Sequence, residues 1–265
     1  MTTVEISALF IAALLAGVIN AVAGGGSFIS FPALLFFNVP SMAANATNAV
    51  ATWPGMMSSA WSYRKVLLKH RKGMLLIAVI SMIGGASGAL LVMHTPKAFF
   101  TLATPVFILI AFLFFAFGPA LAKRKQNRPV TSPATTATEA LCTEKRTLLQ
   151  LVASCYAGYF PSGGGMVLMA LYNSFGIKDA QFINALKCML GVTVSGAAVL
   201  TFVLSGQVYW PQAWIMIAGS LAGGFAGAQM AQRLNPVLLR QTMLILGGSI
   251  TVYFFHKYYG PMVLS

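Results

Sequence analysis

Glycine triplets and polar side chains recur at matched places in otherwise apolar sequence. Glycines inside an apolar helix can break it, and the helix that restarts after the break presents unpaired N–H groups and the positive end of its dipole. Such a terminus binds anions, and an amide or ammonium group beside it adds a donor. The candidate binding residues are Gly24, Gly25, Gly26, Ser27, Asn45, Asn48, Gly163, Gly164, Gly165, Asn184 and Lys187. This pattern predicts a binding site for a small anion.

An internal repeat relates these residues. A shift of 139 residues places Gly24-Gly25-Gly26 on Gly163-Gly164-Gly165 and Asn45 on Asn184. The same shift matches a later group of glycines, Gly84, Gly85 and Gly88 with Gly223, Gly224 and Gly227. Because the identities fall on glycines and asparagine, we interpret them as a duplication. The shift also pairs Asn48 with Lys187, so the two halves differ in charge at this position.

Each of these polar groups has two interpretations. Lys187 lies about two turns after Asp179, the expected helix N-cap, so its ammonium could lie deep enough to bind a sulfite or sulfonate. Alternatively, Lys187 snorkels to the membrane interface. Asn45 and Asn184 could orient an anion, or could hydrogen-bond a neighbouring helix. The glycines could break helices, or could serve only close packing.

The composition excludes an ordinary soluble domain. The 265 residues are 58% hydrophobic and only 8% charged, with a mean hydropathy of +0.79, whereas soluble domains are about 25% charged. Seventeen Lys and Arg oppose four acids. Most of the cations stand between apolar segments, which is typical of cytoplasmic loops. This arrangement explains the positive charge without nucleic-acid binding, so no nucleic-acid partner is expected. The expected partners are the lipid bilayer and a small anionic substrate, and the sequence leaves a homodimer open.

The apolar segments predict two halves. Residues 1–120 form the first transmembrane repeat, 121–146 a basic cytoplasmic linker, and 147–265 the second repeat. Segments 27–37 and 166–176 are too short to cross a hydrocarbon core of about 30 Å as helices, which favours re-entrant pieces over spans but does not decide between them. Ser41 is expected to cap the next helix. The fold class is an all-α polytopic membrane protein in which each half has a glycine-broken segment and about three spanning helices.

Loop charges predict opposite orientations for the halves. The loop around Arg64 to Lys72 carries five cations, and its repeat partner, residues 203–211, carries none. If cations mark the cytoplasm, the first loop lies inside and the second outside, which requires inverted-topology repeats. Both termini are then extracytoplasmic. We expect a multi-pass protein of a bacterial inner membrane.

The sequence lacks the motifs required for nucleotide binding, metal binding and common enzyme mechanisms. No GK[ST] follows the glycines, which argues against a nucleotide site. Cys142, Cys155 and Cys188 have no metal-ligand spacing, and the three histidines form no catalytic set. Of the four acids, only Asp179 lies near the expected core, so a carboxylate proton relay has little to work with. No enzyme activity, cofactor or metal is expected.

Residues 16–55, AGVINAVAGGGSFISFPALLFFNVPSMAANATNAVATWPG, closely resemble the TauE/SafE family of membrane permeases. Residues 157–191 match the second glycine-rich segment more loosely, with PSGGGMVLMALYNSFGI in place of the first pattern. The resemblance implies a permease that exports sulfite, an organosulfonate or a related anion. It carries over Gly24 to Ser27, Asn45, Asn48, Gly163 to Gly165 and Asn184, whereas Lys187 comes from the repeat comparison and its charge.

The leading hypothesis is a secondary permease that binds its anion at midplane and works by alternating access. A passive anion channel would use the same residues, and concentrative uptake would separate the two. A non-transporting membrane scaffold is the third hypothesis, and it predicts no cavity between the two glycine triplets. The direction of transport, the coupling ion and the exact anion are not encoded in any motif that we identify.

Overall fold

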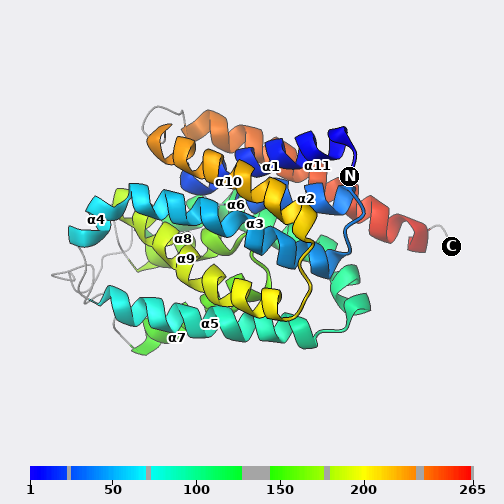
Figure 1. Cartoon of the computed structure of the whole chain (residues 1–265). Coiled ribbons are helices and arrows are strands. Elements are labelled where there is room, and N and C mark those ends of the chain that lie inside the picture. The colour runs from blue at the N-terminus through cyan, green and yellow to red at the C-terminus, as the bar shows by residue number, and fades with distance from the viewer. Residues whose placement is uncertain (23–24, 70–72, 127–143, 176–179, 231–235, 264–265) are drawn as a thin grey trace.

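The computed structural model describes residues 1–22, 25–69, 73–126, 144–175, 180–230 and 236–263. Gly24, Asp179 and most of the expected linker lie outside the described residues. Within them, every regular element is a helix (Figure 1). The helices are α1 (Thr3–Val22), α2 (Ser27–Phe36), α3 (Ser41–Ser62), α4 (Arg64–Lys69), α5 (Met74–His94), α6 (Lys97–Gln126), α7 (Glu144–Tyr159), α8 (Gly164–Ser174), α9 (Ala180–Leu204), α10 (Trp210–Met230) and α11 (Pro236–Val263).

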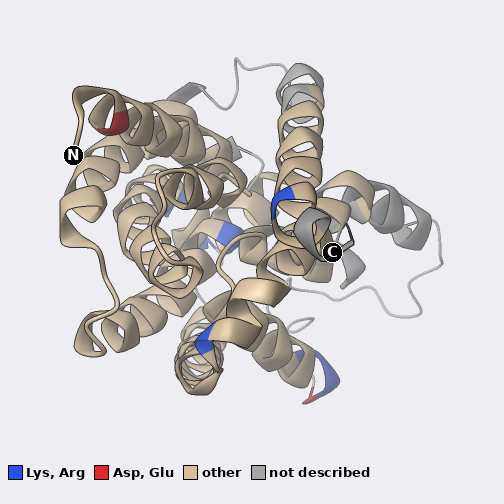
Figure 2. Cartoon of the chain, turned by 90° about the vertical axis from the view of Figure 1, so that its right-hand side faces the viewer, with Lys and Arg blue, Asp and Glu red and all other residues tan. Residues whose placement is uncertain are grey.

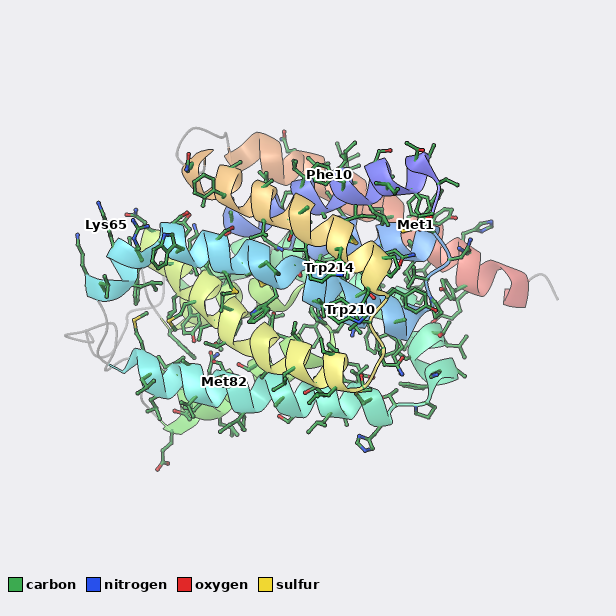
Figure 3. All side chains as sticks on the ribbon, in the orientation of Figure 1. Met1, Phe10, Lys65, Met82, Trp210 and Trp214 are labelled. Atoms are coloured by element: carbon green, nitrogen blue, oxygen red, sulfur yellow. The ribbon has the colours of Figure 1, made fainter. Side chains whose placement is uncertain are left out.

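The outer surface is apolar, as expected for a protein surrounded by lipid. Charged residues are sparse across the described part of the chain (Figure 2), and side chains such as Leu75 and Leu204 are 79% and 78% exposed. Phe10, Met82 and Trp214 point outward from α1, α5 and α10 (Figure 3). In the described residues, three helical stretches are long and apolar enough to cross a membrane: Thr3–Ala21, Met74–His94 and Gln181–Leu204. The chain is therefore a membrane-embedded helical protein.

Some helix boundaries differ from those expected. The basic loop after α3 contains the short helix α4, and α11 continues to Val263 instead of ending near Phe255. The expectation that Ser41 caps α3 is wrong. Pro40 occupies the cap position without a side-chain bond, and the Ser41 hydroxyl lies 3.4 Å from that of Tyr258. The Pro40 carbonyl accepts the N–H of Ala44 over 2.7 Å, so the helix begins after Pro40 without a side-chain cap.

Two helices, α3 and α9, cross at the centre, and other helices pack against them. α10 packs on α3 and α1, while α5 packs on α9 and α7. Glycines permit the α10–α3 and α5–α9 contacts. A Cβ at Gly224 would meet the Gly55 carbonyl, and a Cβ at Gly85 would meet the Val194 carbonyl. Such close approach of backbones is the usual role of small residues between membrane helices.

At the α3–α9 crossing, residues that correspond in the repeat contact each other. The Trp53 indole Nε1–H donates to the Val192 carbonyl over 2.9 Å. The Ser195 hydroxyl lies 3.7 Å from the Met56 sulfur and donates to it. Both pairs are separated by 139 residues in the chain, the same shift that superposes the glycine triplets. We refer to this place as the central crossing.

A buried hydrogen-bond network joins α7 to its neighbours. The Gln150 amide donates to the hydroxyls of Ser81 and Ser154 over 2.8 and 3.0 Å. The Tyr172 hydroxyl donates to the Gln150 carbonyl oxygen over 2.6 Å. Both the nitrogen and the oxygen of the buried Gln150 amide therefore have hydrogen-bond partners. The bond from Tyr172 fixes α8 against α7.

Tyr172→Phe is expected to lower the free energy of unfolding by about 1–2 kcal/mol, because it leaves the Gln150 oxygen buried without a donor. Tyr156→Phe is the matched control, since its buried hydroxyl has no partner among the described residues. Removing that hydroxyl should leave stability unchanged or slightly raised. Thermal unfolding of the two variants in detergent checks the difference, and an equal loss in both would contradict it.

Candidate functional site

Two helix breaks lie in the interior, one in each half. Gly25 and Gly163 have positive φ angles of 88° and 97°, a conformation that glycine adopts without strain. After each break a short helix restarts, α2 at Ser27 and α8 at Gly164. The Asn20 side-chain oxygen accepts the Gly26 N–H over 2.8 Å and so fixes the first break. The described glycines of each triplet therefore lie between two helices or in the first turn of the second one, as the sequence predicts.

A cavity of about 40 Å³ lies between the two breaks. This volume is enough for a few waters or one small ion, since a water needs about 10–15 Å³ by this measure. Its wall combines both halves of the chain, with backbone, aliphatic, hydroxyl and sulfur groups. It is lined by Asn20, Gly25, Met56, Ser59, Ala157, Pro161, Gly164, Gly165, Leu168, Lys187, Cys188, Gly191, Val194 and Ser195.

Lys187 supplies the charge of this cavity. Its side chain is 4% exposed, and its ammonium donates to the Asn184 side-chain oxygen over 3.3 Å. Among the described lining residues, Lys187 alone carries a formal charge. The first turn of α8, with Gly164 and Gly165, stands in the same wall. A buried cation beside a helix N-terminus is an arrangement that attracts an anion.

The predicted site residues separate into two groups. Gly25, Gly164, Gly165 and Lys187 line the cavity, and Asn184 bonds Lys187. Gly26 and Gly163 lie next to lining residues in the chain, and Ser27 follows Gly26; both Gly26 and Ser27 are buried. Because residues from both triplets share one cavity, the structure brings the two breaks together.

Asn45 and Asn48 lie elsewhere, although both are fully buried. The Asn45 amide donates to the Tyr159 carbonyl over 3.1 Å, and the Asn48 oxygen accepts from the Ser30 hydroxyl over 2.6 Å. Neither residue is in the cavity wall. Each retains an unpaired buried atom, Oδ1 of Asn45 and Nδ2 of Asn48, which is costly unless another state supplies a partner.

Position along the helices explains this separation. At 1.5 Å per residue, Lys187 lies about 10 Å along α9 from Ala180, and Asn48 lies about 10 Å along α3 from Ser41. α3 and α9 run in opposite directions from these starting points (Figure 1). The two polar positions therefore lie on opposite sides of the central crossing, and the cavity occupies the side nearer α4.

Sequence reasoning missed several lining residues. Asn20 precedes the first glycine triplet and carries the only amide that lines the cavity among the described residues. Met56 and Ser195 correspond under the 139-residue shift, so applying the shift to whole helices could have suggested that they meet near a pseudo-symmetry axis. Ser59 and Cys188 offer no such signal, because small polar residues are common in membrane helices.

Aromatic side chains fill the space beside the second break. Phe160 is fully buried, and its ring centroid lies 5.4 Å from that of Phe31 and 5.2 Å from that of Phe107. Tyr159 extends the cluster, 5.7 Å from Phe107 and with its hydroxyl 3.2 Å from that of Thr95. This aromatic cluster adjoins Asn45 through the Tyr159 carbonyl.

The fold and cavity define a helical membrane protein with an interior cavity lined by a buried lysine. The chain belongs to the sulfite exporter TauE/SafE family, whose model matches residues 9–254. It is 26% identical over 248 residues to a probable membrane transporter protein of Haemophilus influenzae, covering 92% of this chain and 91% of the relative. It is also 26% identical to the probable membrane transporter protein YfcA of Escherichia coli K12, over 97% of this chain and 91% of the relative.

A third relative agrees with these. The probable membrane transporter protein ORF9 of a Sinorhizobium species is 27% identical over 92% of this chain and 90% of its own length. No solved structure matches the chain. The protein is therefore a member of a membrane transporter family along nearly its whole length, as its sequence resemblance indicates.

Proposed function

We propose that this protein is a secondary permease that moves a small sulfur-containing anion, such as sulfite or a small sulfonate, by alternating access. One observation carries the proposal: the buried Lys187 side chain lines a cavity whose wall combines the glycine breaks of both halves. An anion in this cavity would have its charge balanced by Lys187. Its oxygens would accept bonds from the Lys187 ammonium and from N–H groups at the start of α8.

The architecture that we propose consists of two inverted repeats. Helix contacts occur in matched pairs: α1 with α10 corresponds to α7 with α5, and α3 with α10 corresponds to α9 with α5. A two-fold relation between the halves would produce this pattern. α2 and α8 have 10 and 11 residues, which gives lengths of about 15 Å, half of a hydrocarbon core. These lengths support re-entrant segments.

The proposed orientation follows from charge. Arg64, Lys65 and Lys69 lie on α4, at the end of the molecule opposite the N-terminus and the end of α11 (Figure 1). If this basic end is cytoplasmic, both termini are outside and the cavity is nearer the cytoplasm. We place the protein in a bacterial inner membrane with this orientation.

Alternating access is supported by the unequal state of the two polar positions. The cavity occupies the Lys187 side of the central crossing, while the Asn45 side is packed next to the aromatic cluster. We propose that Asn45 and Asn48 bind the anion when the opposite side opens, using the atoms that are unpaired here. A continuous pore would need both sides open in one state.

Transport in proteoliposomes tests the role of Lys187. Lys187→Met should reduce uptake of sulfite and methanesulfonate by about 100-fold, because it removes a buried countercharge, and truncating such a partner costs about 2–5 kcal/mol. Lys187→Arg should keep anion binding. Both variants must elute from size exclusion at the position of the wild type, so that a loss of uptake is not a loss of folded protein. Wild-type uptake by Lys187→Met would contradict the site.

The asparagines give a distinct expectation. Asn45→Ala and Asn48→Ala should lower net flux about tenfold while leaving the affinity measured from the α4 side unchanged, because neither residue lines the present cavity. Lys187→Met should lose both the net flux and the affinity. Flux that never exceeds equilibration would favour a channel, and a wild type that neither binds nor moves either anion would favour a scaffold.

A further inference from the structure

The Lys187 amine has no anionic group beside it in the described structure. Among the residues that the structure describes, the only other titratable side chain in the cavity wall is Cys188, its neighbour on α9. Among the helices packed against α9, α7 carries Cys155, Tyr156, Tyr159 and, in its first turn, Glu144, Lys145 and Arg146, while α8 carries Tyr172. Tyr63 follows α3. None of these lines the cavity.

The remaining charged groups on neighbouring helices are also remote from the cavity. The cations of α4 are exposed, as is His94 at the far end of α5. On α1, Glu5 accepts a hydrogen bond from Gln212 over 3.3 Å, near the N-terminal end. Within the described part of the chain, Lys187 is thus paired only with a neutral amide, Asn184, over 3.3 Å.

An unpaired charge at this depth is costly in either form. Moving a lone ammonium or a lone anion out of water costs several kcal/mol even after the protein relaxes, and each can offset the cost of the other. A proton on Lys187 and an anion in the cavity therefore favour each other, and by linkage the entry of one promotes the binding of the other.

We propose that each anion travels with one proton, which Lys187 carries as its ammonium. This inference rests on the proposed permease function. As the anion enters, the amine lone pair accepts a proton from water, and when the anion leaves, the same N–H bond gives the proton back to water. No bond to the anion forms. A monovalent anion and its proton cross together without net charge, so the unloaded carrier returns uncharged.

The experiment uses liposomes that contain the full chain, a trapped pH indicator and labelled methanesulfonate. Methanesulfonate is the anion of a strong acid, so it cannot carry the proton itself. Net uptake by the wild type should acidify the interior by about one proton per anion. A potassium diffusion potential set by valinomycin should not change the rate, because the loaded and unloaded carriers are both neutral at the site.

Lys187→Arg separates proton carriage from anion binding. Its guanidinium stays protonated, so the variant should still exchange labelled for unlabelled methanesulfonate but should lose at least tenfold of the net uptake and its acidification. Asp179→Asn is the control for a carboxylate outside the described residues, and it should acidify as the wild type does. Loss of acidification in Asp179→Asn, with retention in Lys187→Arg, would overturn the assignment.

The possible failures are distinguishable. Wild-type uptake of methanesulfonate that follows the membrane potential without acidification overturns proton coupling and leaves the permease intact. Net uptake with acidification in Lys187→Arg moves the proton to another group and overturns the role of Lys187. Failure of the wild type to bind or move either sulfite or methanesulfonate overturns the proposed permease and this coupling with it.

Discussion

Gly26→Ala is expected to leave almost no folded protein, with a loss of more than about 4 kcal/mol of stability. A Cβ at Gly26 would coincide with the backbone of Ala16 on α1. No side-chain rotamer relieves a clash between a Cβ and a backbone, so α2 would have to separate from α1. That separation would also break the bond from the Gly26 N–H to Asn20, which fixes the first helix break.

Gly165→Ala is the matched control, because Gly165 corresponds to Gly26 in the repeat. A Cβ there would find only the Lys187 side chain, at 3.9 Å, which is ordinary contact. This variant should fold, and its methyl group should weaken anion binding severalfold by entering the cavity. Size exclusion in detergent and binding of sulfite check both variants. Equal yields of folded protein would contradict the difference between the two breaks.

Gly224→Leu is the second substitution expected to have a large effect. A Cβ at Gly224 would meet the Gly55 carbonyl and the Ser58 hydroxyl on α3, and a leucine would add three more carbons there. Because α10 lies against both α1 and α3, it cannot retreat from one without disturbing the other. We expect most of the protein to aggregate, with a loss of more than about 4 kcal/mol.

The adjacent position provides the control for Gly224→Leu. Phe225 is 52% exposed on the outer face of α10, so Phe225→Leu should change stability by less than about 0.5 kcal/mol. The measurement is the fraction of monodisperse protein after membrane extraction, followed by thermal unfolding. If Gly224→Leu folded as well as Phe225→Leu, the close α3–α10 contact would be wrong.

The helices and both breaks could be predicted because composition and glycine determine them locally. Apolar segments of the right length must be helical in lipid, where backbone groups have no water as partner. Glycine triplets in those segments have few uses apart from breaks and close contacts. The same reasoning selected Lys187, since a lysine so far into an apolar segment needs a partner or a cavity.

The positions of Asn45 and Asn48 could not be predicted, because repeat equivalence does not give spatial proximity. Two equivalent positions lie close together only if they lie near the axis that relates the halves. Met56 and Ser195 are close to such a place. Asn48 and Lys187 each lie about 10 Å from the N-terminal end of their helix, and the two helices run in opposite directions, so the two residues lie apart. Asn20 was missed for a similar reason, since its role depends on how α2 folds back against α1.

The contact between Met56 and Ser195 bears on how this site arose. Two separate copies of one ancestral half would place identical residues opposite each other at the crossing, and a lysine in one copy would appear in both. The joined chain removes that constraint, since each half carries its own sequence. One half can then hold a lysine at Lys187 while the other holds Asn48, so in the proposed permease the amine that takes up a proton with the anion lies on one side of the central crossing alone.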